Sequence, residues 1–421
     1  MARAKVVSRI AHESCVQAPR IETPRRWWRS LETNFADRPE GFELKLRDAL
    51  LVKASATLDR SIRTFAASAV GTLAIPMGYG PRAISELKRS RGHYEELADH
   101  GDASIFFQKP TRRVALQSKI VRTRLFQPVD GVCEDLTFES PFVPSCPEIR
   151  DNYLKQKANR RAHARLWRHL DGPRPTLVAI HGFGAEQSWL NEWLLALPHF
   201  YRLGLDVMLM TLPFHGPRRT RFSPFSGHGF FAGGALRTNE AFAQAVFDFR
   251  VFLDHLIEDR GVTDVGVTGI SLGGCTSALI ASVEDRIQFA VPNVPVVSLA
   301  DLMLEWRPID LYVKAFMAAS DLSLKDLRHV LAVSSPLTWE PVLARERLMI
   351  VAGVGDRVAP PKHSRILWEH WDRCRLHWFP GSHVIHLDKG EYLVEMARFM
   401  REIDFLPQWD GLQNDAKSVR S

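Results

Sequence analysis

Thr268-Gly269-Ile270-Ser271-Leu272-Gly273-Gly274 runs from an expected strand, residues 264–270, into an expected helix, residues 275–282. Its Gly-x-Ser-x-Gly spacing is typical of a sharp, strained strand-to-helix turn that presents a nucleophilic serine. Glycine is needed at 269 and 273 because side chains there would collide with the neighbouring strand and helix. We expect Ser271 to stand exposed above a sheet, beside free helix-start amides that favour a developing negative charge.

Apolar, β-branched runs recur on both sides of this turn and alternate with segments long enough for crossover helices, such as 239–258 and 275–283. Near-continuous apolar strands separated by helices indicate a parallel sheet that is covered on both faces. The sequence therefore predicts an α/β fold with a mostly parallel, doubly wound sheet. The expected strands are 176–180, 206–212, 264–270, 289–297, 348–352 and 375–379.

A nucleophilic serine needs a base to accept its proton and a carboxylate to orient that base. In folds with this turn, the acid and then the base follow the serine along the chain, in loops at the carboxyl ends of later strands. Asp356 lies just beyond the strand expected at 348–352, and His383 just beyond the strand expected at 375–379. We therefore expect Asp356 to be the acid and His383 the base.

Alternatives to this assignment stay open. Asp356 lies beside glycine and proline, a setting in which aspartate is common as a turn residue. His386 is an alternative base, although His383 directly follows the turn at 380–382, where the loop still reaches the serine. Asp388 and Asp301 are reserve acids.

An oxyanion also needs hydrogen-bond donors, and His181-Gly182-Phe183-Gly184 follows the strand expected at 176–180. Such a His-Gly-rich loop supplies the second donor in folds with this turn, and its small residues let the backbone approach a substrate. We expect the backbone N–H groups of Phe183 and Leu272 to form the oxyanion hole. His181 is expected to hold the loop rather than to act as a base.

The composition is that of an ordinary globular protein, with 421 residues, 45% of them hydrophobic and 24% charged. Five cysteines without a C-x-x-C pair disfavour a disulfide framework and a zinc site. We expect no metal and no cofactor. Charges interrupt the first ten residues before an apolar signal-peptide core could form, so we expect a cytoplasmic protein.

The net charge of +7 is unevenly distributed. Residues 1–175 hold 31 basic and 20 acidic residues, a net of +11, which leaves −4 for the remainder. Two interpretations of the basic part stay open: a solvated surface, and attraction to an anionic membrane surface or an acidic partner. Nucleic acid is not an expected partner, because no recognition motif accompanies the charge.

From about residue 130 to residue 400, the chain resembles the α/β-hydrolase superfamily, with the turn, acid, base and oxyanion loop in that family's order. A closer likeness, to the group known as alpha/beta-hydrolase-domain-containing protein type eighteen, rests on segments 212–219, 233–235 and 266–274. These segments read Leu212-Pro213-Phe214-His215-Gly216-Pro217-Arg218-Arg219, Gly233-Gly234-Ala235 and Gly266-Val267-Thr268-Gly269-Ile270-Ser271-Leu272-Gly273-Gly274. The resemblance implies a serine hydrolase with a helical N-terminal extension, acting on lipid acyl chains.

The expected organisation is a basic helical extension (1–125), a hydrolase domain (126–405) with a helical cap (298–340), and a C-terminal tail (406–421). The predicted function is hydrolysis of a small-molecule or lipid carboxylic ester with an apolar acyl group, through an acyl-enzyme. Two alternatives stay open: an acyltransferase with the same triad, and a non-catalytic binding protein that retains the fold. The sequence predicts no oligomeric state.

Overall fold

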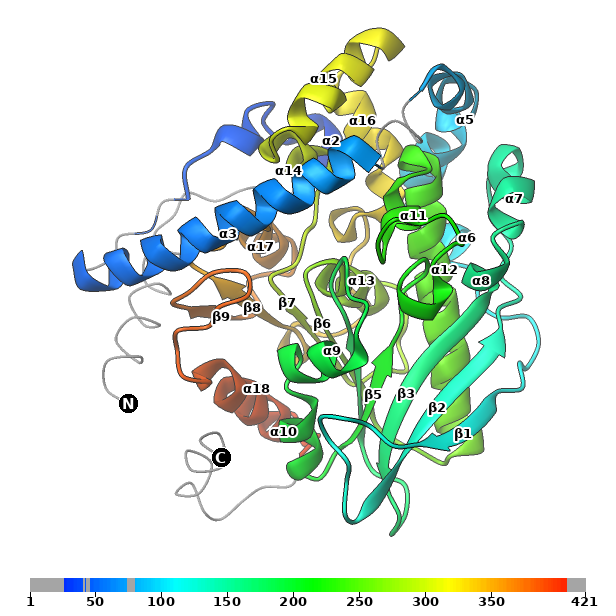
Figure 1. Ribbon diagram of the computed structural model, residues 1–421, viewed down its shortest axis with the longest axis vertical. Helices are drawn as coiled ribbons and strands as arrows, with labels where there is room; N and C mark the ends of the chain where they lie inside the picture. Colours follow the sequence, from blue (N-terminus) through cyan, green and yellow to red (C-terminus); the bar gives the residue numbers. More distant parts are fainter. Residues whose placement is uncertain (1–25, 41, 43–45, 74–79, 407–421) are drawn as a thin grey trace.

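The computed structural model describes residues 26–40, 42, 46–73 and 80–406 (Figure 1). Nine strands form one sheet in the order β1-β2-β3-β5-β4-β6-β7-β8-β9, antiparallel from β1 to β5 and parallel from β5 to β9. The strands are β1 (Gln117–Val121), β2 (Gly131–Glu139), β3 (Arg161–His169), β4 (Thr176–Ile180), β5 (Asp206–Met210), β6 (Val265–Ile270), β7 (Phe289–Asn293), β8 (Met349–Gly353) and β9 (Arg375–Phe379).

All six strands expected from the sequence are present, and their bounds differ from the expected ones by four residues at most. Every residue of β4, β5, β7 and β8 is buried, because helices cover both faces of the parallel part. The prediction of a mostly parallel, doubly wound sheet is confirmed.

The antiparallel strands β1, β2 and β3 were not predicted from the sequence. Buried residues alternate with more accessible ones along much of β2 and β3, and β1 is mostly exposed, so these strands lack the continuous apolar pattern of β4, β5, β7 and β8. On β3, Arg165 bonds Asp135 at 2.6 Å and Arg168 bonds Glu134 at 2.6 Å, so arginines of the basic part pair with acids of β2. β1 lies on the N-terminal side of the boundary expected at 125/126 and belongs to the sheet.

Helices lie on both faces of the sheet and at its ends (Figure 1). The α-helices of the described residues are α2 (Trp27–Ser30), α3 (Leu46–Leu73), α5 (Pro81–His100), α6 (Ala103–Phe106), α7 (Pro147–Leu154), α8 (Lys157–Arg160), α9 (Ser188–Leu194), α10 (Leu197–Arg202), α11 (His228–Phe231), α12 (Gly234–Asp254), α13 (Leu272–Ala281), α14 (Leu299–Glu305), α15 (Ile309–Ser320), α16 (Leu324–Val330), α17 (Pro361–His370) and α18 (Glu391–Glu402). Short 3₁₀ or π turns are η1 (Phe35–Asp37), η2 (Gly216–Arg218), η3 (His255–Asp259), η4 (Ala332–Ser334), η5 (Pro336–Thr338) and η6 (Arg345–Arg347).

The described N-terminal segment is largely helical up to residue 106, and it packs into the core of the sheet domain. Trp27, Trp28 and Phe35 are buried in the same hydrophobic cluster as residues of the central strands and α12. Figure 1 shows α3 lying across the molecule, where it contacts α15. Residues 1–25 and all but the first residue of the expected C-terminal tail lie outside the described residues.

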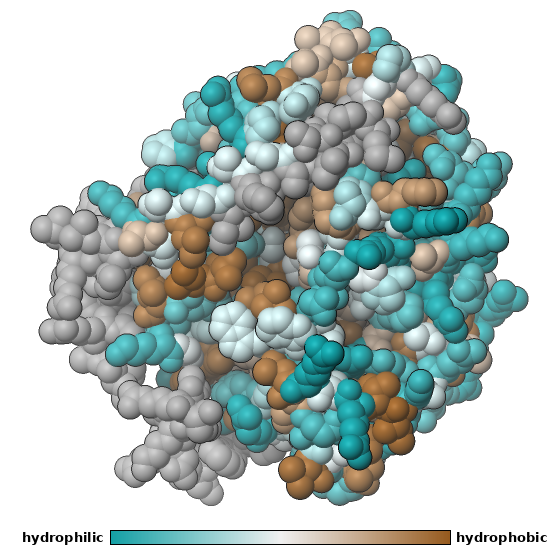
Figure 2. Space-filling view, viewed as in Figure 1, coloured by the Kyte–Doolittle hydropathy of each residue, from teal (hydrophilic) through white to brown (hydrophobic). Residues whose placement is uncertain are grey.

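Three helices, α14, α15 and α16, occupy the segment expected to be a cap. None of the helices within the described ranges is both long enough and apolar enough to cross a membrane. Figure 2 shows hydrophobic residues gathered near the middle of one face, where Figure 1 places α9. Trp189, Leu190 and Trp193 of α9 are exposed.

Candidate functional site

Ser271 occupies the turn between β6 and α13, and its backbone has φ 58° and ψ −112°. Residues other than glycine rarely adopt a positive φ, so the backbone at Ser271 is strained in the way found at functional sites. Its backbone N–H donates to the Asn293 carbonyl at 2.9 Å, which ties the turn to the end of β7. The serine is only partly buried, whereas the residues that follow it in α13 are buried.

The two flanking glycines leave no room for a side chain. A Cβ atom at Gly269 would lie 2.2 Å from the carbonyl oxygen of Gly273, and one at Gly273 would lie 2.1 Å from that of Ile180. Both contacts are with backbone, which cannot swing aside. Side chains at these positions would thus collide with the strand and the helix, as expected from the sequence. Glycine at both positions lets α13 lie close to the end of β4.

Asp356 and His383 lie in the loops after β8 and β9, and the structure brings them into contact. Asp356 Oδ2 bonds His383 Nδ1 at 2.7 Å, and both side chains are buried. Asp356 Oδ1 accepts the backbone N–H groups of Val358 and Ala359, each at 2.8 Å, so all the acceptor contacts of this carboxylate hold one orientation. The roles of turn residue and catalytic acid are therefore compatible at Asp356, because one oxygen serves each.

The electrostatics of this pair favour a protonatable imidazole. Burial lowers the pKa of His383, but the charge of Asp356 and its hydrogen bond raise it, and the net shift is upward. Because Nδ1 faces the carboxylate, Nε2 is the nitrogen left to exchange a proton with a substrate or a serine.

His386 has different surroundings. Its ring packs against Phe379, with centroids 4.0 Å apart, and edge-on against Tyr392 at 4.4 Å. Burial lowers its pKa to about 4. No hydrogen bond joins His386 to Asp356 within the described residues, so the structure brings the carboxylate to His383 and not to the alternative base.

The reserve acids also lie elsewhere. Asp301 forms a buried ion pair with Arg328 at 2.6 Å. Asp388 accepts the backbone N–H groups of Gly390 and Tyr392 at the start of α18.

The loop after β4 approaches the serine from the other side. His181 Nδ1 donates to the Gly182 carbonyl at 2.8 Å, while His181 Nε2 accepts the Leu212 backbone N–H at 3.1 Å. Nε2 is therefore unprotonated, and burial lowers the pKa of His181 to about 4. This neutral histidine ties its own loop to the chain after β5, in keeping with a supporting role.

Small residues bring the same loop close to Ser271. A Cβ atom at Gly182 would lie 3.5 Å from Ser271 Cβ, and Gly184 has φ +77°. Within the described part of the chain, neither the Phe183 nor the Leu272 backbone N–H donates a hydrogen bond. Two amides are thus free on either side of the serine. Ser271 Oγ likewise has no hydrogen-bond partner among the described residues.

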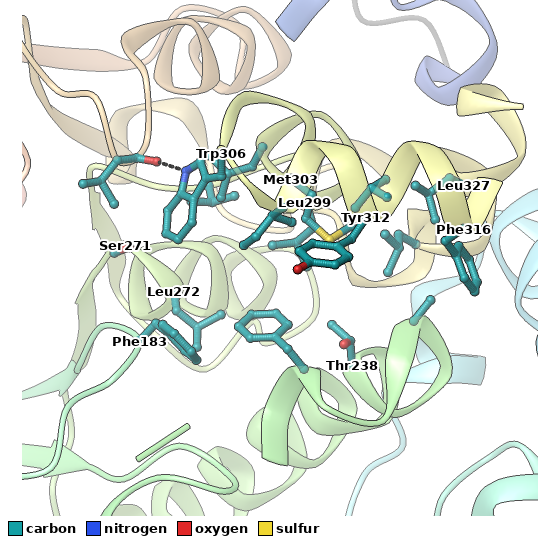
Figure 3. A pocket seen from close by; sticks show the side chains of 18 residues that line it. Phe183, Thr238, Ser271, Leu272, Leu299, Met303, Trp306, Tyr312, Phe316 and Leu327 are labelled. Atoms are coloured by element: carbon teal, nitrogen blue, oxygen red, sulfur yellow. Dashed lines mark hydrogen bonds between the residues drawn. The ribbon is translucent and has the colours of Figure 1, made fainter. Parts of the chain in front are cut away.

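An apolar pocket opens beside Ser271. Figure 3 shows Ser271, Leu272 and Phe183 at one end and Phe316 and Leu327 at the other. The cap helices form one wall, and α11 and α12 form the opposite wall. The lining residues are Phe183, Phe231, Ala235, Thr238, Ser271, Leu272, Val296, Leu299, Leu302, Met303, Trp306, Ile309, Tyr312, Val313, Phe316, Leu327, Leu331 and Val358.

Sequence analysis did not single out Asp59, a buried carboxylate of α3 that lies against the acid and base loops. Asp59 Oδ2 accepts the backbone N–H of His383 at 2.7 Å and that of Arg357 at 3.1 Å. No local pattern marks this residue, because its partners are about 300 positions away along the chain.

Comparisons with known proteins are informative about the fold. No protein-family model matches the chain. Over 253 residues it is 32% identical to uncharacterized proteins of Mycobacterium tuberculosis, MT2702 of strain CDC 1551 / Oshkosh and Rv2627c of strain ATCC 25618 / H37Rv. The match covers 59% of this chain and 59% of the length of these relatives.

Two solved structures resemble this one over most of its length. Acetyl xylan esterase 1 from Thermoanaerobacterium sp. JW/SL YS485 is 18% identical with a TM-score of 0.52, covering 74% of this chain and 93% of that one. The acetyl xylan esterase from Paenibacillus sp. R4 is 16% identical with a TM-score of 0.53, covering 75% and 94%. Together with the sheet order and the strand-turn-helix at Ser271, these likenesses show that the chain has the α/β-hydrolase fold.

Proposed function

We propose that this protein hydrolyses carboxylic esters with an apolar acyl group, through an acyl-enzyme on Ser271. The observation that carries the proposal is the strained serine at the mouth of an apolar pocket, with a bonded acid and histidine at neighbouring strand ends. The structural relatives named as acetyl xylan esterases agree with ester hydrolysis. The finer likeness to the type eighteen group stays a prediction.

In the first half-reaction, Ser271 Oγ attacks the ester carbonyl carbon while His383 Nε2 takes the hydroxyl proton. Asp356 holds the imidazole by Nδ1 and stabilises the imidazolium that forms. The carbonyl oxygen becomes an oxyanion between the free amides of Phe183 and Leu272. The tetrahedral intermediate then collapses, the C–O bond breaks, and His383 returns the proton to the departing alcohol.

In the second half-reaction, water repeats the attack on the acyl-serine. His383 removes a proton from the water, the same two amides hold the second oxyanion, and Ser271 leaves with the proton as the acid is released. The start of α13 adds to this stabilisation, because the positive end of its dipole faces the developing charge.

The substrate class follows from the pocket wall. Among the lining residues, only Thr238, Ser271 and Tyr312 carry hydroxyl groups, and none carries a charge. The indole N–H of Trp306 is already bonded to the Val358 carbonyl at 3.0 Å (Figure 3). A charged or strongly polar acyl group would lose its water without gaining partners there, whereas an aliphatic chain gains apolar burial.

A panel of p-nitrophenyl esters of graded acyl length tests this function. We expect turnover that rises with chain length until the pocket is filled, and complete loss of turnover in Ser271→Ala. Ser282→Ala is the matched control, because Ser282 ends the same helix with its hydroxyl bonded to Ala278 and Trp339 carbonyls. A fluorophosphonate probe should label wild type and Ser282→Ala, but not Ser271→Ala.

Labelling that persists in Ser271→Ala would contradict the proposed nucleophile. An unlabelled, inactive wild type would favour a non-catalytic binding protein with this fold. Product analysis with a competing alcohol distinguishes hydrolysis from acyl transfer, because a transferase gives the new ester in place of the acid.

We further propose a cytoplasmic protein that contacts anionic membrane surfaces through its basic N-terminal part. The net charge of +11 over residues 1–175 supports the attraction, although Arg165 and Arg168 are already paired. Sedimentation with phosphatidylserine vesicles should show binding at low salt that is lost at high salt. Binding that does not depend on salt, or its absence, would contradict the proposal.

A further inference from the structure

We infer that Asp59 is a positioning residue for the acid and the base, so that α3 of the N-terminal segment is part of the catalytic apparatus. The inference rests on the proposed function, because it assigns a role within the reaction of Ser271, His383 and Asp356. It rests on geometry that joins three distant parts of the chain at one buried oxygen atom.

One oxygen of Asp59 connects the two loops. Oδ2 accepts the backbone N–H of His383 itself and the backbone N–H of Arg357, the residue after Asp356. The separation between these two loops sets the 2.7 Å contact between Asp356 and the imidazole. A shared acceptor therefore fixes the base relative to the acid.

Other contacts of α3 fix the position of Asp59. Arg63, one helical turn later, donates to the Arg357 carbonyl at 2.9 Å. Val52, two turns earlier, packs so closely that a Cβ atom at Gly355 would lie 2.7 Å from Val52 Cγ1. Residues 52, 59 and 63 lie on one face of the helix. This face packs against the loop that carries Asp356.

Asp59 also places a second carboxylate near the imidazole. The side chain is fully buried, and its Oδ1 atom has no hydrogen-bond partner among the described residues. Burial and the neighbouring Asp356 raise the pKa of Asp59, and its two backbone donors oppose that rise. Burial and the Asp356 charge both disfavour the ionised form of Asp59. Carboxylates perturbed in this way cluster at functional sites.

The charged groups around the imidazole come from three elements. Asp356 faces it from the loop after β8, Asp59 from α3, and His386 from its own loop. Burial lowers the pKa of His383, and the two carboxylates raise it. The charge of His383 in turn lowers the pKa of His386. Arg63 lies beyond Asp59 and interacts with it. Loss of the Asp59 charge should therefore make His383 easier to deprotonate and its imidazolium less stable.

The experiment compares wild type, Asp59→Asn and Asp59→Ala with Asp206→Asn as the matched control. Asp206 is also a buried carboxylate that accepts a backbone N–H and contacts a ring, both of His169, but it lies at the amino end of β5. Each variant is melted thermally, and kcat and KM for the best ester of the panel are then measured as functions of pH.

Asp59→Asn keeps an oxygen that can accept both N–H groups but removes the charge. We expect the acidic limb of its kcat/KM profile to move to lower pH, with KM unchanged. Asp59→Ala also removes the shared acceptor, and its kcat should fall by about 10- to 100-fold, the scale of a small misplacement of catalytic groups. Asp206→Asn should lower the melting temperature and leave the pH profile superimposed on wild type.

An acidic limb of Asp59→Asn that superimposes on wild type would overturn the inference. If Asp59→Ala does not fold, the asparagine variant decides alone. A wild type without Ser271-dependent turnover overturns both the proposed function and this inference, whereas normal wild-type turnover with an unshifted asparagine variant overturns only the role of Asp59.

Discussion

Replacement of Gly273 by alanine should abolish activity while it costs little stability. The added Cβ atom would lie 2.1 Å from the Ile180 carbonyl oxygen and 2.6 Å from that of His181. Ordinary contact begins at 3.4 Å, so the backbone at the end of β4 or the start of α13 must move by roughly 1 Å. That movement separates the Phe183 amide from the Leu272 amide, which are the proposed oxyanion donors.

The two effects differ in scale. Overpacking of this kind costs about 1–3 kcal/mol. At about 2.1 cal/mol/K per residue, the unfolding entropy of 421 residues is on the order of 0.9 kcal/mol/K, so the melting temperature should fall by only ~1–3 °C. Loss of one oxyanion donor, in contrast, lowers kcat by about 10²- to 10³-fold.

Differential scanning calorimetry and ester turnover measure the two effects on the same preparation. Gly92→Ala is the matched control, because Gly92 lies within α5 and a Cβ atom added there would meet nothing within 4 Å. This control should keep full activity and gain about 0.5–1 kcal/mol. A Gly273→Ala protein with more than a tenth of wild-type kcat would refute the steric argument.

Three further predictions concern pH, acyl length and a buried ion pair. Activity requires a neutral His383, and Asp356 raises the pKa of this residue by more than burial lowers it. The value of kcat/KM should therefore rise with pH through a midpoint above 6.5, and a midpoint well below 6.5 would contradict this. Ala235→Phe should reduce turnover of long-chain esters while sparing acetyl esters, because Ala235 lines the pocket; an unchanged chain-length profile would count against an acyl pocket. Asp248→Ala should cost about 3–5 kcal/mol in calorimetry, because it leaves the fully buried Arg218 without its 2.7 Å partner.

The strands that could be predicted from the sequence, β4 to β9, are mostly buried. β4, β5, β7 and β8 are buried along their whole length and therefore appear as near-continuous apolar runs, and glycine at 269 and 273 marks the tight approach of α13 to β4. β1 to β3 were not predicted because β1 is mostly exposed and charged residues interrupt β2 and β3. Their arginines looked like a basic surface, although Arg165 and Arg168 face acids of the adjacent strand.

The choice between His383 and His386 shows the same limit at the level of the site. They are three positions apart in the sequence, so either could be placed near the serine. The loop places the two rings differently: Gly381 has φ +141°, and the Ser382 N–H donates to the Ile385 carbonyl, so the chain doubles back. That reversal leaves His386 packed between Phe379 and Tyr392, without a hydrogen bond to Asp356 among the described residues.

Helix α3 connects the two halves of the proposed site, and it explains why an N-terminal extension would accompany this fold. At Asp59 the helix holds the loops of the acid and base. Two turns later Ala67 is buried in a cluster with Ile309 and Val313 of α15, which also line the apolar pocket. A shift of α3 would therefore move the cap and the imidazole together. One helix thus contacts both a wall of the pocket and the loop of the candidate base.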